Sequence, residues 1–231
     1  MDFEELKTIS ALDGTDVDRK LYLVVSATPL KMGKAIRAAS GYPYNHVSLA
    51  LSSDIPVMYS FARRFLSAPY YGGFVEESPR RFAYKNRFAW IRVYALSVRE
   101  ATFEALEELI GQMASDREHY LYNFISVAHA VFRKRIIIKD SYTCAEFVSD
   151  VISIVSPRTG LVCGGFYTVK DICEALDGSM IYEGTAEGFS QRASWDNDCF
   201  IEKLSFSSGL VHTLRDLGQL LRRSVSGTAE K

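Results

Sequence analysis

The spacing of apolar residues changes near residue 97, and this change limits the folds that the chain can adopt. Before it, apolar side chains alternate or cluster in short segments bounded by turn residues, which is typical of β-strands. The predicted strands are 21–26, 46–51, 57–62 and 88–94. A short helix is predicted between the first two, with Thr28 as its N-cap, Pro29 at its first position and Gly41 as its stop. After residue 97, apolar residues recur every three or four positions, which predicts helices. These are 97–113, 119–132, 142–155, 168–176 and 210–223, with short strands at 135–139 and 180–184.

Strands and helices do not alternate strictly in this pattern, which favours an α+β fold over a doubly wound parallel sheet. We expect an antiparallel meander of strands packed against helices. The segment Asp54-Ile55-Pro56 supplies breaker residues between two of the strands, so 46–51 and 57–62 are predicted to be antiparallel neighbours. Ser97 and Glu100 have capping-box spacing, which predicts that a helix begins there.

The length of 231 residues is compatible with a single domain over 1–231 with one substantial core. Residues 1–19 are polar and are predicted to form a loose arm. Residues 209–231 are predicted to form an amphipathic helix and a polar tail. The helix carries one apolar stripe, which we expect to pack on the domain; its members are Leu210, Leu214, Leu217 and Leu221.

Charge and composition indicate few partners. The chain has 27 basic and 28 acidic residues, a balance that does not favour nucleic acid as a partner. The acidic N-terminus does not resemble a secretory signal, and no apolar stretch reaches the roughly 18 residues of a transmembrane segment. The four cysteines include no Cys-x-x-Cys pair, so neither zinc nor another metal is predicted. We therefore expect a cytoplasmic protein with free thiols. The sequence does not indicate an oligomeric state.

Cys144 and His46 are the residues that could carry chemistry. Cys144 is predicted to lie in the first turn of a helix, where unpaired backbone N–H groups stabilise a thiolate and can bind an oxyanion. A thiol nucleophile needs a nearby base, most often histidine. His46 begins a predicted strand and would serve if that strand packs beside the helix. Alternatively, Cys144 is a small buried apolar side chain and His46 only a residue at a strand edge.

The segments "NHVSLAL", "VMYSFARR" and "SYTCAEFVSDVI" resemble the circularly permuted papain-like amidases, the YaeF/YiiX-type branch of the NlpC-like hydrolases. In that branch the histidine strand precedes the cysteine helix, and here His46 precedes Cys144 by 98 residues. The similarity runs from about Leu21 to about Leu176, and its specific parts are the histidine strand and the cysteine helix.

The resemblance implies a papain-like fold and a cysteine amidase or peptidase acting on a small peptide or amide, with no cofactor. It also implies a third residue that orients the histidine from the following strand. Ser60 is preferred for this role over Tyr59, with Glu76 and Glu77, in a predicted loop, as alternatives. The predicted substrate-binding residues are Tyr44, Tyr59 and Tyr142.

Two other functions remain open. The same scaffold supports an acyltransferase or lipid hydrolase, for which the C-terminal helix would have to seek a membrane. A binding module without activity would also fit, since the preferred third residue, Ser60, carries no charge to stabilise an imidazolium ion. Fold resemblance alone does not choose among these functions.

Overall fold

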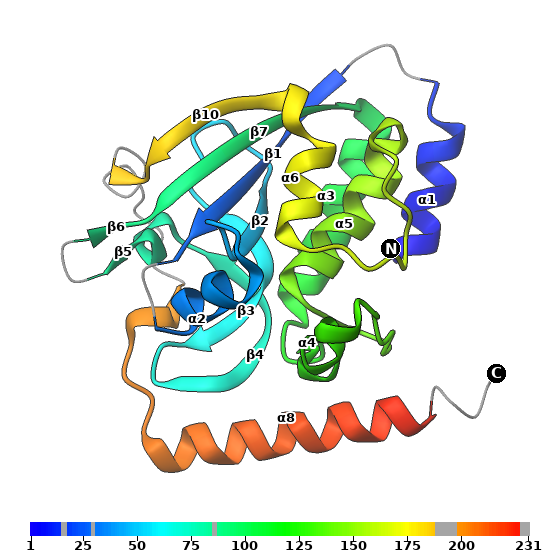
Figure 1. Ribbon diagram of the computed structural model, residues 1–231. Coiled ribbons are helices and arrows are strands. Elements are labelled where there is room, and N and C mark those ends of the chain that lie inside the picture. The colour runs from blue at the N-terminus through cyan, green and yellow to red at the C-terminus, as the bar shows by residue number, and fades with distance from the viewer. Residues whose placement is uncertain (15–17, 29–30, 85–86, 188–197, 227–231) are drawn as a thin grey trace.

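The computed structural model describes residues 1–14, 18–28, 31–84, 87–187 and 198–226, which form an eight-stranded sheet with helices packed mainly on one of its faces (Figure 1). The described strands are β1 (Asp18–Ala27), β2 (His46–Ala50), β3 (Met58–Phe65), β4 (Ala68–Glu77), β5 (Ala83–Tyr84), β6 (Arg87–Phe88), β7 (Trp90–Arg99), β8 (Leu121–Tyr122), β9 (Ser141–Tyr142) and β10 (Met180–Thr185). The described helices are α1 (Phe3–Leu12), α2 (Lys31–Ser40), α3 (Glu100–Ser115), α4 (Phe124–His129), α5 (Cys144–Val155), α6 (Val169–Ala175) and α8 (Phe206–Ser226). The predicted α+β class is confirmed.

The sheet is mixed, with the order β10-β7-β1-β2-β3-β4-β8-β9. Its middle strands pair antiparallel, and only the short edge pair β8 and β9 is parallel. The predicted antiparallel pairing of β2 with β3 is confirmed, with Leu49 opposite Tyr59. This order places β2 near the middle of the sheet, so its first residue, His46, has neighbours on both sides.

The main core lies between the sheet and the helices α1, α3, α5 and α6 (Figure 1). Helix α5 buries nearly every side chain, and its Phe147 ring lies 5.4 Å from the ring of Phe61 and 6.0 Å from that of Phe74. Aromatic contacts at these distances hold the helix against β3 and β4. The start of α5 is therefore anchored beside the sheet strands that carry the candidate site.

The N-terminal segment is a helix and not the loose arm that the polar composition predicts. Asp2 and Glu5 form a capping box at the start of α1. Leu6 is fully buried, because α1 packs on α3 and α5. Phe3 and Ile9 also pack against this core, so several apolar side chains dock the segment.

Strand β4 lies where the sequence pattern predicts a loop, because two glycines interrupt the alternation of its residues. A Cβ atom on Gly73 would lie 2.1 Å from the carbonyl oxygen of Tyr120, a distance that no side chain tolerates. Glycine is therefore required where β8 approaches β4, with Gly73 opposite Leu121. This close approach brings β8 into the wall of the candidate site.

Three local predictions are wrong because tertiary pairing overrides the local pattern. Ser97 stays in β7 and accepts a hydrogen bond from Lys20, so α3 begins later, after Arg99. The segment 119–132 forms β8 and the short helix α4 in place of one long helix. The segment 135–139 contributes only an isolated bridge between Ile138 and Ser141.

Helix α8 forms as predicted but packs through a different face. Leu210, Leu214 and Leu221 are 47%, 61% and 58% exposed, whereas Leu220 and Asp216 are buried. The helix lies along the side of β4, below the other elements in Figure 1. Three of the four residues of the predicted apolar stripe are therefore exposed, while Leu217 is half-buried. The last five residues of the predicted polar tail, 227–231, lie outside the described residues.

Candidate functional site

A pocket of about 250 Å³ lies where the first residue of α5 meets the ends of β2 and β4. Cys144, His46 and Glu77 all line it, together with apolar and basic side chains from β3, β8 and α4. The structure thus brings together Cys144 and His46, which lie far apart in the sequence. The remaining lining residues are Thr28, Gly33, Ile36, Asn45, Phe61, Ala62, Arg63, Pro69, Tyr70, Arg81, Phe82, Tyr122, Phe124, Val127 and Phe200.

Cys144 is the first residue of α5 and is 7% exposed. The residue before it, Thr143, caps the helix: its side chain accepts from the Glu146 backbone N–H at 3.2 Å, and Glu146 accepts from the Thr143 backbone N–H at 2.7 Å. Within the described residues, no acceptor is found for the backbone N–H groups of Cys144 and Ala145. These two donors lie at the positive end of the helix dipole, beside the sulfur.

His46 is placed by the residue before it. The side-chain oxygen of Asn45 accepts from the Thr28 backbone N–H at 3.0 Å and from Arg37 at 2.6 Å. The Asn45 backbone N–H donates to Ser26 at 3.1 Å. Asn45 therefore ties the start of β2 to β1 and α2. This fixes the position of His46, the first residue of β2, beside the pocket.

The His46 ring is hydrogen bonded to a buried carboxylate. Its Nε2 lies 3.0 and 2.9 Å from the two oxygens of Glu77. Ser48 donates to Glu77 at 2.5 Å, and Arg81 donates to it at 3.2 Å. Arg81 is itself held by two hydrogen bonds to Asp198, at 2.7 and 2.8 Å. Because Nε2 donates to Glu77, Nδ1 is the ring nitrogen left for Cys144.

The charges of this network stabilise one another. Burial of the His46 ring opposes its charge, but the Glu77 carboxylate and side-chain hydrogen bonds to Cys144 and Glu77 raise the pKa of His46 to about 10. Burial raises the pKa of Glu77, but His46, Arg81 and Ser48 together outweigh it and lower that pKa to about 2. At neutral pH the pair is therefore an imidazolium and a carboxylate, and the imidazolium is within hydrogen-bond reach of the sulfur.

Ser60 does not occupy the third position, and its predicted role is corrected here. It is fully buried, and its hydroxyl donates to the backbone carbonyl of Val47 at 2.8 Å. Glu77, the weaker alternative from the sequence, bonds His46 instead. Strand β4 pairs with β3 so that Glu77 lies opposite Met58, and its carboxylate bonds Ser48 and His46 of β2. Glu77 is the last residue of β4, whose two glycines interrupt the strand pattern in the sequence. Only recognition of this strand could have identified Glu77 from the sequence.

The three tyrosines predicted to bind substrate do not line the pocket. Tyr44 is buried and donates to Glu183 at 2.7 Å. Tyr59 stacks on Phe74, with ring centroids 6.4 Å apart, and Tyr142 packs on Phe61 at 5.1 Å. Each of the three side chains contributes to packing, and none of them lines the cavity. The tyrosines that do line it are Tyr70 and Tyr122, from β4 and β8.

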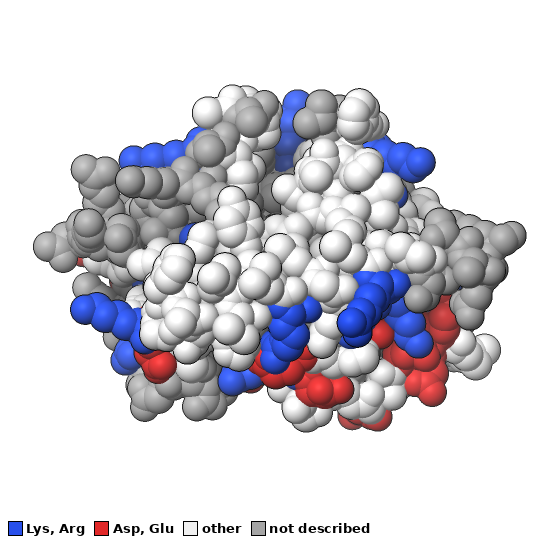
Figure 2. Space-filling model, turned by 90° about the horizontal axis from the view of Figure 1, so that it is seen from below, with Lys and Arg blue, Asp and Glu red and all other residues white. Residues whose placement is uncertain are grey.

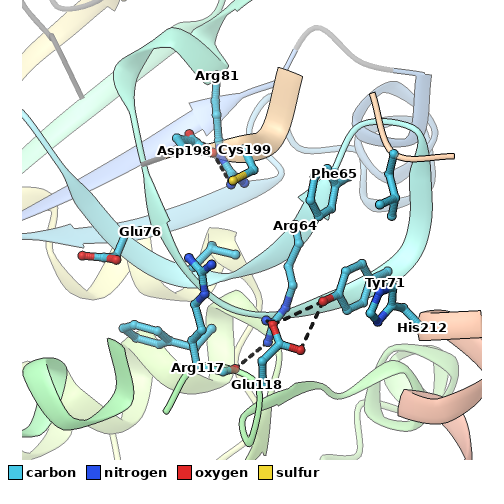
Figure 3. A pocket seen from close by; sticks show the side chains of 13 residues that line it. Arg64, Phe65, Tyr71, Glu76, Arg81, Arg117, Glu118, Asp198, Cys199 and His212 are labelled. Carbon is cyan, nitrogen blue, oxygen red and sulfur yellow. Dashed lines mark hydrogen bonds and ion pairs between the residues drawn. The ribbon is translucent and has the colours of Figure 1, made fainter. Parts of the chain in front are cut away.

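A second pocket of about 180 Å³ lies between β3, β4 and α8 (Figure 3). There the Arg64 guanidinium bonds Glu118, which also accepts from Tyr71 at 3.2 Å. The His212 ring stacks on Tyr71 with centroids 4.7 Å apart. These contacts hold α8 against the sheet. Cys199 also lines this pocket, but Cys144 and His46 do not, so we assign no chemistry to it.

The chain matches no protein-family model, no curated protein and no solved structure. In the described part of the chain, no group of three or more His, Cys, Asp or Glu side chains could hold a metal ion. None of the described helices is both long and apolar enough to cross a membrane.

Proposed function

We propose that this protein is a cysteine-dependent amidase or peptidase of the permuted papain-like type, acting through an acyl-enzyme. One observation carries the proposal: the His46 ring contacts a carboxylate on one side and the Cys144 thiol, at a helix N-terminus, on the other. This is the arrangement of nucleophile, base and orienting group that thiol acyl-transfer chemistry requires. The order of His46 before Cys144 supports the permuted type.

In the proposed mechanism, the Cys144 proton already resides on Nδ1 of His46 before the substrate binds, and the thiolate attacks the substrate carbonyl carbon. The carbonyl oxygen becomes an oxyanion, which accepts from the backbone N–H groups of Cys144 and Ala145. The pKa of Tyr122 is raised well above its ordinary value, first by burial and then by the charge of Cys144, so its phenol keeps its proton and can donate as well.

Collapse of this intermediate breaks the C–N bond as His46 donates its proton to the leaving amine. Water then gives a proton to His46 and attacks the thioester, and the carboxylic acid leaves as the Cys144 thiolate and the His46 imidazolium are regenerated. Glu77 stays ionised throughout, because its pKa is lowered to about 2. Its role is to hold the ring by Nε2 and to stabilise the imidazolium.

A burst assay with p-nitrophenyl acetate tests this mechanism without knowledge of the natural substrate. We expect release of one nitrophenolate per chain and an acetyl group on Cys144, detected by peptide mass spectrometry. Cys144→Ala and His46→Ala should abolish the burst. Cys163→Ala is the matched control, since Cys163 is exposed and lies outside the pocket. Absence of a burst, or a burst that survives Cys144→Ala, would refute the proposal.

A second candidate is an acyltransferase or lipid hydrolase with the same site. It is favoured by the outward stripe of α8, where Phe206 is 87% exposed along with the leucines described above. Figure 2 shows the molecule from this side, where uncharged residues cover a broad central area, acidic side chains lie along the lower edge and basic side chains lie along both edges. An exposed amphipathic face of this kind suits the surface of a lipid bilayer.

Flotation with phosphatidylcholine–phosphatidylserine vesicles tests this candidate. Binding that is lost in the double variant Leu214→Ser, Leu221→Ser would support it. Both side chains are largely exposed, so we expect the variant to keep its fold. Gln219→Ser, on a less exposed part of α8, is the matched control. If the unaltered protein does not float with the vesicles, the lipid candidate loses its main support. The binding-module alternative loses its main argument, since Glu77 supplies an acidic group beside His46.

A further inference from the structure

Arg63 is a basic residue in the wall of the Cys144 pocket. It lies on β3 two positions after Phe61, and side chains two apart on a strand share a face. Phe61 also lines the pocket. Tyr122 is close to both charges, because its pKa responds to Arg63 as well as to Cys144. Arg63 is thus near the reacting sulfur without belonging to the His46 network.

The other charged groups of the pocket have partners. Glu77 is bound by His46, Ser48 and Arg81, and Arg81 is bound by Asp198. Arg64, the next residue along the chain from Arg63, bonds Glu118 and two backbone carbonyls. These arginines are therefore occupied by structural contacts.

The guanidinium of Arg63 has no hydrogen bond or ion pair to any of the described residues. The guanidinium lies over the ring of Phe200, whose centroid is 5.8 Å away. Burial and the charge of Arg81 lower its pKa, which means that the group is held in a positive, partly desolvated place. A guanidinium in such a place can donate hydrogen bonds to an anionic group.

We infer that Arg63 binds a carboxylate of the substrate, so that the enzyme acts on amides that carry a carboxylate close to the scissile bond. The planar guanidinium matches a carboxylate in two parallel hydrogen bonds. The aromatic walls, which include Phe61, Phe124 and Phe200, suit an apolar group on the other side of the bond. The substrate class is therefore an N-acyl amino acid or a short peptide with a free carboxyl end. This inference rests on the proposed function.

Binding to the inactive Cys144→Ala variant tests the inference separately from catalysis. The probes are N-benzoylglycine and its neutral amide, N-benzoylglycinamide, which differ only in the charged group. Isothermal titration should show the carboxylate bound about 10- to 100-fold more tightly, as charge-assisted hydrogen bonds predict. Adding Arg63→Gln should remove this preference, and adding Arg63→Lys should keep part of it. Arg80→Gln, at an exposed arginine outside the pocket, is the matched control and should keep it all.

Several results would overturn the inference: equal binding of the two probes, no binding of either at millimolar concentration, or a preference that survives Arg63→Gln. Tighter binding of the phosphonate analogue than of the carboxylate would overturn the choice of carboxylate. The proposed function fails separately, by absence of the burst in the unaltered protein. Circular dichroism melting of each variant checks that loss of binding is not loss of folding.

Discussion

Replacement of Glu77 by glutamine tests the charge network at its centre. Glutamine keeps the size of the side chain and can still accept from Nε2 of His46, but it carries no charge. The pKa of His46 is about 10 in the folded protein, against an ordinary 6.5. At 1.36 kcal/mol per pH unit, this corresponds to up to about 5 kcal/mol of imidazolium stabilisation, of which Glu77 is the largest favourable source.

The expected result is a large fall in the pKa of His46, to or below 6.5, because burial of the ring then acts with little opposition. If all of that stabilisation supports the thiolate, alkylation of Cys144 at pH 7 falls by at most roughly 10³- to 10⁴-fold. The pKa is measured by NMR titration of the His46 ring, and the alkylation by iodoacetamide with peptide mass spectrometry. Neither assay needs the natural substrate.

Glu76→Gln is the matched control, because Glu76 is the adjacent acid on β4 and makes no bond to His46. It should leave both measurements within about twofold of the unaltered protein. The reasoning is refuted if Glu77→Gln leaves the titration midpoint and the alkylation rate where they were. Arg81 keeps its hydrogen bonds to Asp198 in the variant, so the wall of the pocket should persist.

Three further predictions concern stability. The His46–Glu77 pair contributes fully to the unfolding free energy between about pH 4.5 and 6.5. The contribution of His46 is lost as the pH rises toward about 10, and that of Glu77 is lost as the pH falls toward about 2. Unfolding free energies from urea titrations should therefore depend less on pH in Glu77→Gln than in the unaltered protein. Gly73→Ala should cost about 1–3 kcal/mol, since its Cβ would meet backbone at 2.1 Å, whereas Gly111→Ala meets nothing within 4 Å and should be neutral or stabilising; equal urea midpoints would contradict this. Leu6→Ala should cost about 2–5 kcal/mol if α1 is part of the core, while Leu12→Ala, at a residue 80% exposed, should have little effect; a small effect at both would mean that α1 does not dock.

Much of the cysteine side of the site follows from local sequence. The helix that begins at Cys144 is set by a capping box of four residues, Thr143 to Glu146, and by an apolar stripe with helical period. The strand after His46 is set by its alternation, and the turn at 54–56 makes it pair with β3. These signals act between residues a few positions apart, so the chain reveals them without its fold.

The carboxylate side of the site depends on contacts across the fold. Glu77 is chosen over Ser60 by the register of the β3–β4 hairpin, and a shift of one residue would turn the Glu77 side chain to the other face of the sheet. Tyr122 reaches the pocket only because Gly73 lets β8 approach β4. The outward face of α8 likewise depends on which of its sides meets β4.

The sequence by itself determined the α+β class, the helix that presents Cys144 and the strand that starts with His46, because period and capping are short-range properties of the backbone. Only the tertiary structure decided that Glu77 holds the imidazole and that Tyr44, Tyr59 and Tyr142 pack away from the pocket. It also decided that the Arg63 guanidinium has no hydrogen bond or ion pair within the described part of the chain. These outcomes depend on register and on packing between distant segments, where displacement by a single residue exchanges a buried face for an open one.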